Sequence, residues 1–306
     1  MPRLIDPGPG EAITLAEMIE ALDATRFDPR DAAGFATLGP LLARLGRNPH
    51  FLADMAIAEL KDRCTGQIAS NSYGGQVFLL HPPNGRYVVR ANFWPALNDA
   101  VTRSSGTAAF FYDMPHDHNF PFLTVGYLGP GYRSDDYERD PEAIIGVPGE
   151  PAGLRFVERS QLSPGALMLY RARADVHRQI PPEAFSVSLN ILGYDPAQPW
   201  VEQYRFDVER DTVAEGLTVA PSEALVALAA AFGSGNGLDL ASAFAAHHPV
   251  DRMRVTALDA LMATDPHEGL RRLTRAADGP SRTVAAHARW RLATLASATI
   301  TEPVVA

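Results

Sequence analysis

The stretch 66–207 is a succession of short runs rich in β-branched and aromatic residues, each bounded by glycine, proline, asparagine or aspartate. This punctuation constrains the fold strongly, because runs bounded in this way form short strands rather than long helices. The tripeptide Pro-Asn-Gly at 83–85 separates the first two runs and predicts a β-hairpin. The expected strands are 76–80, 86–94, 107–114, 123–128, 154–161, 166–171, 185–192 and 201–207. Such a series of strands and turns is typical of a β-sandwich or barrel.

The distribution of proline and alanine divides the chain. Residues 66–205 hold 14 of the 25 prolines and 13 alanines, whereas the shorter stretch 220–298 holds 21 alanines. Alanine favours helix and proline interrupts it, so a β unit is expected to precede a helical unit. None of the expected strands is followed by a glycine-rich phosphate loop, which argues against a nucleotide-binding fold.

The first 65 residues are expected to be helical. Thr14 is a suitable N-cap for a helix whose apolar side chains recur at helical spacing, at Leu15, Met18, Ile19 and Leu22. We therefore predict three parts. Residues 1–65 form a helical segment that packs on the β unit, 66–210 form the β unit, and 211–306 form a C-terminal helical unit.

A weak internal repeat marks the C-terminal part. Pro249 and Pro280 open similar segments, and Leu261 and Leu292 occupy matching places, both pairs being offset by 31 residues. That period resembles two-helix repeats of the HEAT type. Two such repeats are too few for a free-standing solenoid, so they are expected to cap or extend the β unit. Helices of this kind predict a protein or peptide partner.

Charge and cysteine content exclude several classes of function. The formal net charge of −9 makes the chain a poor binder of nucleic acid or of an anionic membrane surface. The single cysteine, Cys64, excludes a disulfide framework and any zinc site that needs several thiolates. Neither a signal peptide nor an apolar run of about 18 residues is visible. A cytoplasmic protein that contacts neither nucleic acid nor membrane is expected.

Three histidines form the most informative pattern. His116 and His118 follow the expected strand at 107–114, and residues two apart on an extended segment point the same way. His177 comes after a Pro-Gly turn and the expected strand at 166–171, which places it at the exit of that strand. Three imidazoles brought together in this way suit a divalent transition metal.

This arrangement resembles the cupin superfamily, in which a His-x-His motif and a later lone histidine hold a metal. The resemblance covers about 140 of the 306 residues. Within the superfamily the chain looks most like the thiol dioxygenases, the cysteine dioxygenase group, because the runs at 86–90, 176–178, 185–190 and 193–196 are similar in kind and order. The resemblance implies a mainly β fold with a cupin-type barrel, the double-stranded β-helix. It also implies His116, His118 and His177 as metal ligands.

The chain departs from these families at several positions. Many cupins carry a fourth ligand, a glutamate, where this sequence has Phe122 and Leu123. The thiol dioxygenases have a histidine and a tyrosine on the last core strand, where this chain has Asn190 and Leu192. In space, Tyr194, Tyr170 or Tyr127 are the candidates to replace that tyrosine. A cysteine positioned to crosslink to the tyrosine is also missing, because Cys64 comes too early.

The metal preference of the three histidines can also be inferred from coordination chemistry alone. Three neutral imidazoles suit Fe(II), Ni(II), Cu(II), Zn(II) or Mn(II), and a three-ligand face leaves up to three positions of an octahedral ion open for substrate and O₂. Each ligand histidine also needs an acceptor for its second ring nitrogen. Asp113, Asp117 and Asp175 are the candidates by proximity in sequence.

Three further residues are candidates for catalysis. In the resembled enzymes an arginine near the place of Arg90 binds the substrate carboxylate, and a guanidinium matches a carboxylate with two hydrogen bonds. Val88 and Asn92 are expected on the same strand face as Arg90. Tyr112, next to the histidine motif, is a candidate hydrogen-bond donor or acid. Asn190 is expected to face the cavity.

The acidic stretch 134–140 is interpreted as a solvated loop, or as a lid that carries Tyr132 and Tyr137. Other histidines lie beside expected helix ends or turns and are interpreted as surface or capping residues, namely His50, His81, His247, His248 and His267.

The leading hypothesis is a mononuclear non-haem Fe(II) oxygenase that oxidises a small carboxylate-bearing thiol, amino acid or peptide with O₂. Zn, Ni or Mn are the other metals considered. One alternative is a non-catalytic cupin that binds a ligand while its helical tail recruits a protein. Another is an isomerase or lyase that uses a metal without O₂. A bound iron with O₂ consumption would separate the first hypothesis from the others.

Overall fold

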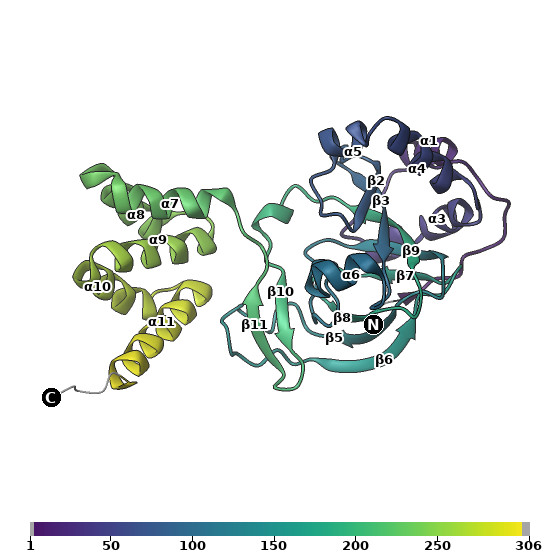
Figure 1. Ribbon diagram of the computed structural model, residues 1–306. Coiled ribbons are helices and arrows are strands. Elements are labelled where there is room, and N and C mark those ends of the chain that lie inside the picture. The colour runs from purple at the N-terminus through teal and green to yellow at the C-terminus, as the bar shows by residue number, and fades with distance from the viewer. Residues whose placement is uncertain (1–2, 302–306) are drawn as a thin grey trace. The chain divides into compact units, whose positions relative to one another are not determined.

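The computed structural model describes residues 3–301, and side chains to residue 297. It divides into two compact units (Figure 1). The first comprises Met1–Pro141 with Ala152–Asp211, and the second comprises Glu142–Pro151 with Thr212–Ala306. The three histidines of the sequence motif all belong to the first unit.

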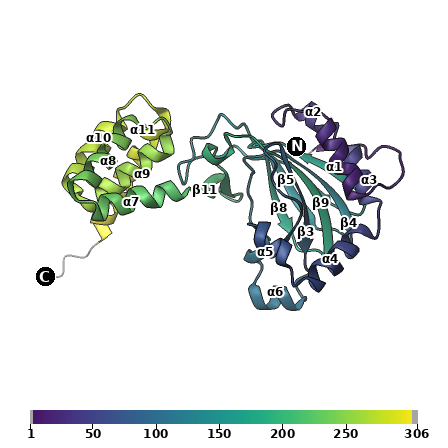
Figure 2. The same cartoon turned by 90° about the horizontal axis from the view of Figure 1, so that it is seen from above.

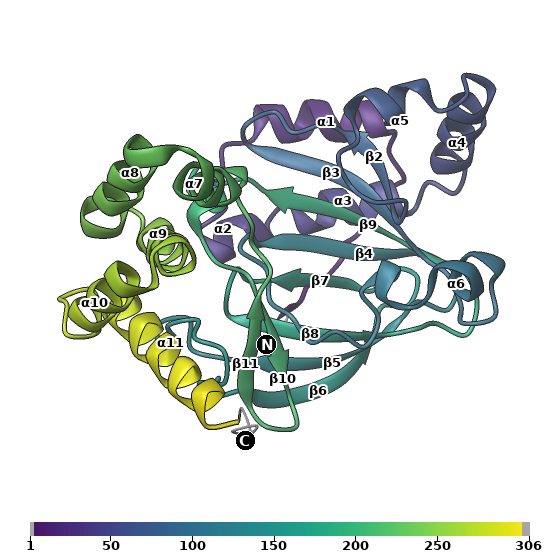
Figure 3. The same ribbon diagram turned by 60° about the vertical axis from the view of Figure 1, so that its left-hand side comes forward.

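The first unit contains a six-stranded sheet and a three-stranded sheet, both antiparallel throughout (Figure 3). The order in the larger sheet is β1 (Arg3–Leu4), β7 (Leu167–Tyr170), β4 (Phe122–Leu128), β9 (Ser186–Gly193), β3 (Tyr87–Trp94) and β2 (Val77–His81). The order in the smaller sheet is β6 (Arg155–Gln161), β5 (Arg133–Glu138) and β8 (Asp175–Ile180).

Helices from the N-terminal segment cover the outer face of the six-stranded sheet (Figure 2). They are α1 (Leu15–Ala24), α2 (Ala32–Ala36), α3 (Gly39–Gly46) and α4 (Phe51–Lys61), whereas α5 (Thr65–Ser70) lies beside the edge strand β2, where the Gln67 amide bonds the Leu79 backbone. Thr14 caps α1 as expected, since its hydroxyl accepts from the Glu17 N–H and the Glu17 carboxylate accepts from the Thr14 N–H. Met18, Phe35 and Leu42 are fully buried against the sheet.

Alternation along the strands gives this sheet two different faces. On β9, Leu189 and Ile191 join the core beneath the helices, whereas Asn190 and Leu192 point to the inner face. The inner face lies against the smaller sheet, where Tyr170 of β7 donates a hydrogen bond to Asp136 of β5. The candidate site lies on this inner face.

The expected strand at 107–114 is wrong. After α6 (Ala100–Ser105), the chain forms the 3₁₀ turn η1 (Ala108–Phe110), and both Phe111 and Asp113 have positive φ angles that end an extended run. The alternation that suggested a strand has another cause, because Phe110 and Tyr112 are buried side by side in the inner core, with ring centroids 5.9 Å apart. Six of the other expected strands correspond to β2, β3, β4, β6, β7 and β9. The expected strand at 201–207 is shorter in the structure, where the 3₁₀ turn η2 (Gln198–Trp200) precedes β10 (Tyr204–Asp207).

The acidic stretch is neither a solvated loop nor a lid, because most of it is the central strand of the smaller sheet, β5. Its charge is balanced from both neighbouring strands. Asp135 forms ion pairs with Arg159 of β6 at 2.6 Å and with Arg178 of β8 at 2.6 Å. Asp136 is fully buried beside it.

Up to residue 301, the second unit is an array of helices with the strand β11 (Thr212–Gly216). The helices are α7 (Pro221–Phe232), α8 (Ser234–His247), α9 (Asp251–Thr264), α10 (Pro266–Ala277) and α11 (Arg282–Thr301). Small and branched side chains such as Ala257, Leu258 and Leu261 form its core. Helices α9 and α11 begin 31 residues apart, at 251 and 282, which is the offset of the sequence repeat. The HEAT-type assignment stays a prediction.

Two parts of the expected fold class need qualification. The chain is not mainly β, because more of its described residues are helical than extended. The six-stranded and three-stranded sheets face each other, β10 and β11 pair as a separate two-stranded sheet, and the closed cupin-type barrel stays a prediction. Within residues 3–301, the helices are too short or too polar to cross a membrane.

Candidate metal centre

His116 and His177 are held opposite each other by the backbone. The His116 N–H donates to the His177 carbonyl and the His177 N–H donates to the His116 carbonyl, both at 3.0 Å. A residue pair that exchanges both hydrogen bonds projects its side chains to the same side. His177 lies inside β8, not at the exit of the preceding strand as expected. The two imidazole centroids are consequently 4.7 Å apart.

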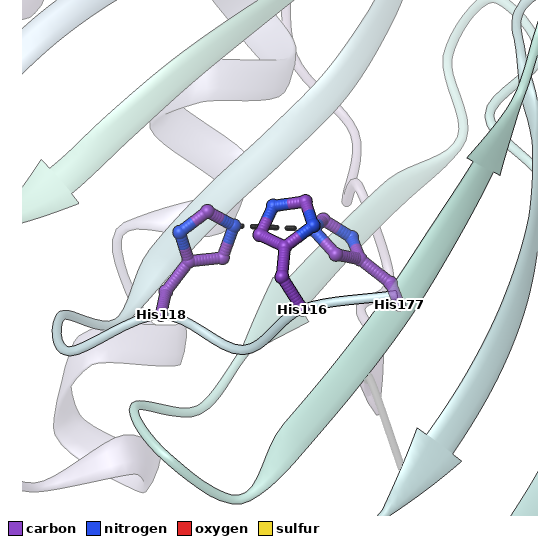
Figure 4. Close-up of side chains that lie close together, drawn as sticks. All are labelled: His116, His118 and His177. Atoms are coloured by element: carbon purple, nitrogen blue, oxygen red, sulfur yellow. Dashed lines mark hydrogen bonds between the residues drawn. The ribbon is translucent and has the colours of Figure 1, made fainter. Parts of the chain in front are cut away.

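His118 completes the cluster from two residues further along the same loop. Its Nε2 lies 3.1 Å from His177 Nε2, and its ring centroid is 4.8 Å from that of His116. One ring nitrogen from each of the three histidines lies within 4.8 Å of the other two (Figure 4). The sequence expectation that these three side chains converge is therefore met in the structure.

The donor set fits a transition-metal ion. Imidazole nitrogens bind such ions at about 2.0–2.1 Å, so two ligands at a right angle lie about 3 Å apart, close to the separation of the two Nε2 atoms. His116 and His177 are buried and His118 is partly buried. The set contains neither a thiolate nor a carboxylate, and so it suits iron, nickel, zinc and manganese alike.

Burial also prepares the histidines for metal binding. Desolvation lowers the pKa of His116, and it holds the pKa values of His118 and His177 well below the usual range. The imidazoles are thus neutral at physiological pH, which is the form that binds a metal. The nearby charge of Arg90 lowers the pKa of His118 further.

A backbone carbonyl orients His116, not an aspartate. Nδ1 of His116 lies 2.7 Å from the Met114 carbonyl oxygen, which makes it the protonated nitrogen and turns Nε2 towards the other histidines. The expected carboxylate acceptors are wrong for this ring. The Asp175 carboxylate accepts from Arg171, Asp117 pairs with Arg139, and Asp113 is exposed.

Asp117 anchors the histidine loop from behind. Its carboxylate accepts a hydrogen bond from Arg139 at 2.7 Å and another from the Tyr204 N–H at 2.7 Å, and the Asp117 and Arg139 side chains are fully buried. The Arg139 guanidinium also lies 5.5 Å from the centroid of the Phe206 ring. Since alternate residues of an extended segment face opposite ways, burying Asp117 on one side directs His116 and His118 to the other.

A cavity of about 310 Å³ opens in front of the histidines. Arg90 of β3 and Asn190 of β9 line it, and they are direct cross-strand neighbours. Asn92 lines the same cavity and Val88 shares the same strand face, as alternation predicts for the neighbours of Arg90. Two of the three candidate catalytic residues thus lie beside the three histidines.

Tyr112 is placed differently. It does not line this cavity, its hydroxyl donates to the Pro95 carbonyl oxygen at 2.8 Å, and its ring packs 6.1 Å from Trp94. Burial raises its pKa well above the usual tyrosine value. A catalytic role for Tyr112 stays a prediction without a contact to support it.

Sequence reasoning missed Gln179 and Trp94 as cavity residues. The Gln179 amide nitrogen lies 3.0 Å from His177 Nε2, so this side chain is positioned to contact any ligand bound beside that histidine. A signal for it was present, because Gln179 is two residues after His177 and therefore shares its strand face. Tyr132 was assigned to a lid, but it is buried against Trp94, with ring centroids 4.3 Å apart.

A buried carboxylate lies behind the histidines on the smaller sheet. Asp136 accepts hydrogen bonds from Ser160 at 2.6 Å and from Tyr170 at 3.3 Å, and Tyr170 stacks on Phe122. Desolvation outweighs these bonds and raises the pKa of Asp136 to about 6.

Stability is expected to depend on pH through this group. The pKa of Asp136 is higher in the folded protein than in the unfolded chain, so the unfolded chain loses this proton first as the pH rises. The stability that this group contributes is therefore lost as the pH rises from about 4 to about 6. A shift of about two pKa units corresponds to about 3 kcal/mol. Urea unfolding of the wild type and Asp136→Asn at pH 4 and pH 7 measures it. From pH 4 to pH 7 the wild type should lose about 2 kcal/mol relative to the variant, because the unfolded aspartate is already partly ionised at pH 4. A difference that is constant with pH would contradict the assignment.

Comparison with known proteins gives little further guidance. No protein-family profile matches the sequence, and no curated protein matches it. A chain from crystal structures of two DMSP lyases is 14% identical, with 43% of this chain and 52% of that chain covered and a TM-score of 0.26. This chain therefore spans about half the length of that one. A hydroquinone 1,2-dioxygenase, solved with Cd²⁺ and 4-hydroxybenzonitrile, is 16% identical over 42% of this chain and 71% of that one, with a TM-score of 0.25.

A DMSP lyase from Ruegeria pomeroyi covers more of the chain. It is 12% identical over 64% of this chain and 79% of that one, with a TM-score of 0.21. Likenesses with scores this low do not establish a shared fold.

Proposed function

We propose that the protein is a mononuclear non-haem Fe(II) oxygenase that oxidises a small carboxylate-bearing substrate with O₂. The observation that carries this proposal is the convergence of three imidazoles, with one ring nitrogen from each within 4.8 Å of the others, in a cavity that also contains a guanidinium. His116, His118 and His177 would hold the ion. When bound to three imidazoles, Fe(II) supplies open positions at which a substrate and O₂ meet.

Arg90 is the residue that we assign to the substrate carboxylate. It lies on the cavity wall, and burial lowers its pKa. Among the ion pairs of the described residues none involves Arg90, and its Nε has no hydrogen-bond partner in that part of the chain. A largely desolvated cation without a counter-ion is costly, so an anionic ligand would stabilise it.

The other cavity residues would orient the substrate and exclude water. Asn190, beside Arg90, has a buried amide nitrogen without a hydrogen-bond partner among the described residues, and this donor is available to a ligand oxygen. Aromatic side chains form much of the wall, including Trp94, Phe122 and Tyr132. An apolar wall of this kind strengthens the charge-assisted bond to Arg90 by excluding solvent.

Metal content and O₂ uptake test the proposal together. Protein purified without chelator, or reconstituted anaerobically with Fe(II), is expected to hold about one iron per chain and to consume O₂ when a matching thiol or amino acid is added. Elemental analysis and an oxygen electrode provide the two measurements. Zinc, nickel or manganese with turnover in the absence of O₂ would instead indicate a metal-dependent isomerase or lyase. No metal after reconstitution would leave a non-catalytic binding module.

Replacing Arg90 tests the carboxylate assignment. Arg90→Gln removes a hydrogen bond to a charged group, which is worth about 1.5–3 kcal/mol, so substrate or acetate binding is expected to weaken about 10- to 150-fold. Isothermal titration on the metal-loaded protein measures this change. Arg103→Gln, at an exposed position on α6, is the matched control and should bind as the wild type does. Equal affinity in both variants would refute the role of Arg90.

A protein partner is a second proposal, for the C-terminal helices. Leu225, Leu228 and Phe232 on α7 are 62%, 56% and 83% exposed, and they occupy one face of the helix while Val226 and Ala230 are buried on the other. A triple serine variant at the three exposed positions is expected to lose any co-purifying protein while keeping its melting temperature. Sedimentation and mass spectrometry of the purified protein would measure this, and an unchanged set of co-purifying proteins would count against the proposal.

A further inference from the structure

A second cavity of about 250 Å³ shares a wall with the histidine cavity. Tyr73 and Phe120 line both, so these two side chains form the boundary between them. Phe120 also lies next to the candidate metal centre, because its ring centroid is 4.9 Å from that of His118. A molecule held at the histidines is therefore separated from the second cavity by little more than two aromatic rings.

The two cavities follow each other along one face of the six-stranded sheet. Arg90 and Val88 are alternate residues of β3, and their cross-strand neighbours on β9 are Asn190 and Leu192. Arg90 and Asn190 line the histidine cavity, whereas Val88 and Leu192 line the second one. Along the strands the inner face thus changes from polar to apolar within two residues, a step of about 7 Å.

The second cavity offers mainly apolar surface to a ligand. Val88, Leu192, Phe120 and proline rings contribute to its wall. The polar side chain of Asn119 is already engaged, since its amide nitrogen donates to the carbonyl oxygens of Gln198 at 3.1 Å and Val201 at 2.9 Å. A hydrocarbon group in this cavity would therefore displace water without leaving that amide unpaired.

Tyr73 is the exposed residue of the boundary between the two cavities. It is 37% exposed, and the two glycines that follow it, Gly74 and Gly75, have no neighbouring atoms within 4 Å of where a Cβ would lie. Its ring packs 4.9 Å from the guanidinium carbon of Arg90. A ligand that reaches Arg90 would therefore lie near Tyr73, one of the two side chains that separate the cavities.

We propose that the second cavity receives the apolar part of the substrate, so that the substrate class is a carboxylate joined to a hydrocarbon chain or ring. The carboxylate binds Arg90 beside the three histidines, and the apolar group extends past Tyr73 and Phe120 towards Val88 and Leu192. This inference rests on the proposed function for its carboxylate anchor.

Binding of a homologous series tests the inference without any turnover. Acetate, butanoate, hexanoate and octanoate are titrated into the metal-reconstituted protein by calorimetry, together with 1-hexanol as an uncharged probe. Each methylene that becomes buried is worth about 0.8 kcal/mol, or about a fourfold gain in affinity. Affinity is expected to rise with chain length until the second cavity is filled, and 1-hexanol should bind more weakly than hexanoate.

Two variants localise the gain. Leu192→Phe fills the second cavity from the sheet, and Pro199→Trp fills it from an exposed position on η2, so that one of them remains informative if the other fails to fold. Both should bind acetate and metal as the wild type does but should lose most of the gain from butanoate to octanoate. Arg90→Gln should weaken every carboxylate and leave 1-hexanol unchanged.

The outcomes separate this inference from the proposed function. If acetate binds through Arg90 but affinity is independent of chain length, the apolar compartment is refuted while the carboxylate site stands. If neither acetate nor metal binds, the proposed function is refuted. The inference is then refuted as well, because it depends on the carboxylate anchor at Arg90. Retention of the full chain-length gain in folded Leu192→Phe and Pro199→Trp would also overturn it, because the chain would then lie elsewhere.

Discussion

A protein carrying His116→Ala is expected to lose its metal ion. Within the part of the chain that the structure describes, three imidazoles form the ligand set, so removing one leaves two donors and an ion open mainly to water. Loss of an outer partner alone typically lowers metal affinity about 10- to 100-fold, and loss of a direct ligand should exceed that range. Elemental analysis after purification and reconstitution should show about one equivalent of metal in the wild type and almost none in the variant.

His50→Ala is the matched control for this experiment. His50 is exposed at the start of α4, where its side chain makes no capping hydrogen bond, and it lies outside the cluster. This variant should retain the metal in full. Near-stoichiometric metal in folded His116→Ala would show that the ion binds elsewhere and would refute the three-histidine centre.

The second large effect is expected for Asp117→Ala. The substitution leaves the Arg139 guanidinium fully buried without its carboxylate and removes the acceptor for the Tyr204 N–H. Breaking one side of a buried ion pair costs about 3–5 kcal/mol, because the remaining charge has lost its partner. Urea unfolding should show a loss of stability in that range, and metal affinity should fall as well, since Asp117 fixes the direction of the histidine loop.

Two control experiments show whether the loss of stability comes from the unpaired buried charge. Asp28→Ala removes an exposed ion pair with Arg30 and should leave the unfolding midpoint essentially unchanged. Asp117→Leu combined with Arg139→Leu removes both buried charges and should recover part of the lost stability. A stable Asp117→Ala variant with normal metal affinity would show that the ion pair does not hold the loop.

Local patterns predicted those features of the site that depend on alternation. The shared direction of His116 and His118, and the common face of Val88, Arg90 and Asn92, follow from the two-residue period of extended chain. The expected strand at 166–171 placed His177 at a strand end, but its pairing with His116 and His118 relied on the resemblance to cupins, because no local pattern connects residues some 60 positions apart. The structure supplies that connection through the paired backbone of the two segments.

The errors of sequence analysis arose where a distant residue changes what a local pattern means. The acidic run at 134–140 looks solvated until Arg159 and Arg178, on two other strands, neutralise Asp135. Asp117 looked like a partner for a histidine because its own partner, Arg139, is 22 positions away in the sequence. Strand register likewise decides that Asn190 lies beside Arg90.

The histidine centre joins two segments of the chain that are 59 residues apart at His118 and His177. An ion bound there acts as a crosslink that exists only in the folded protein, because the unfolded chain does not assemble the ligand set. Folding stability must then rise with free metal concentration, by about 2.7 kcal/mol at one hundred times the dissociation constant. The melting temperature of this protein is therefore a direct measure of metal preference, and it ranks the candidate ions before any substrate is known.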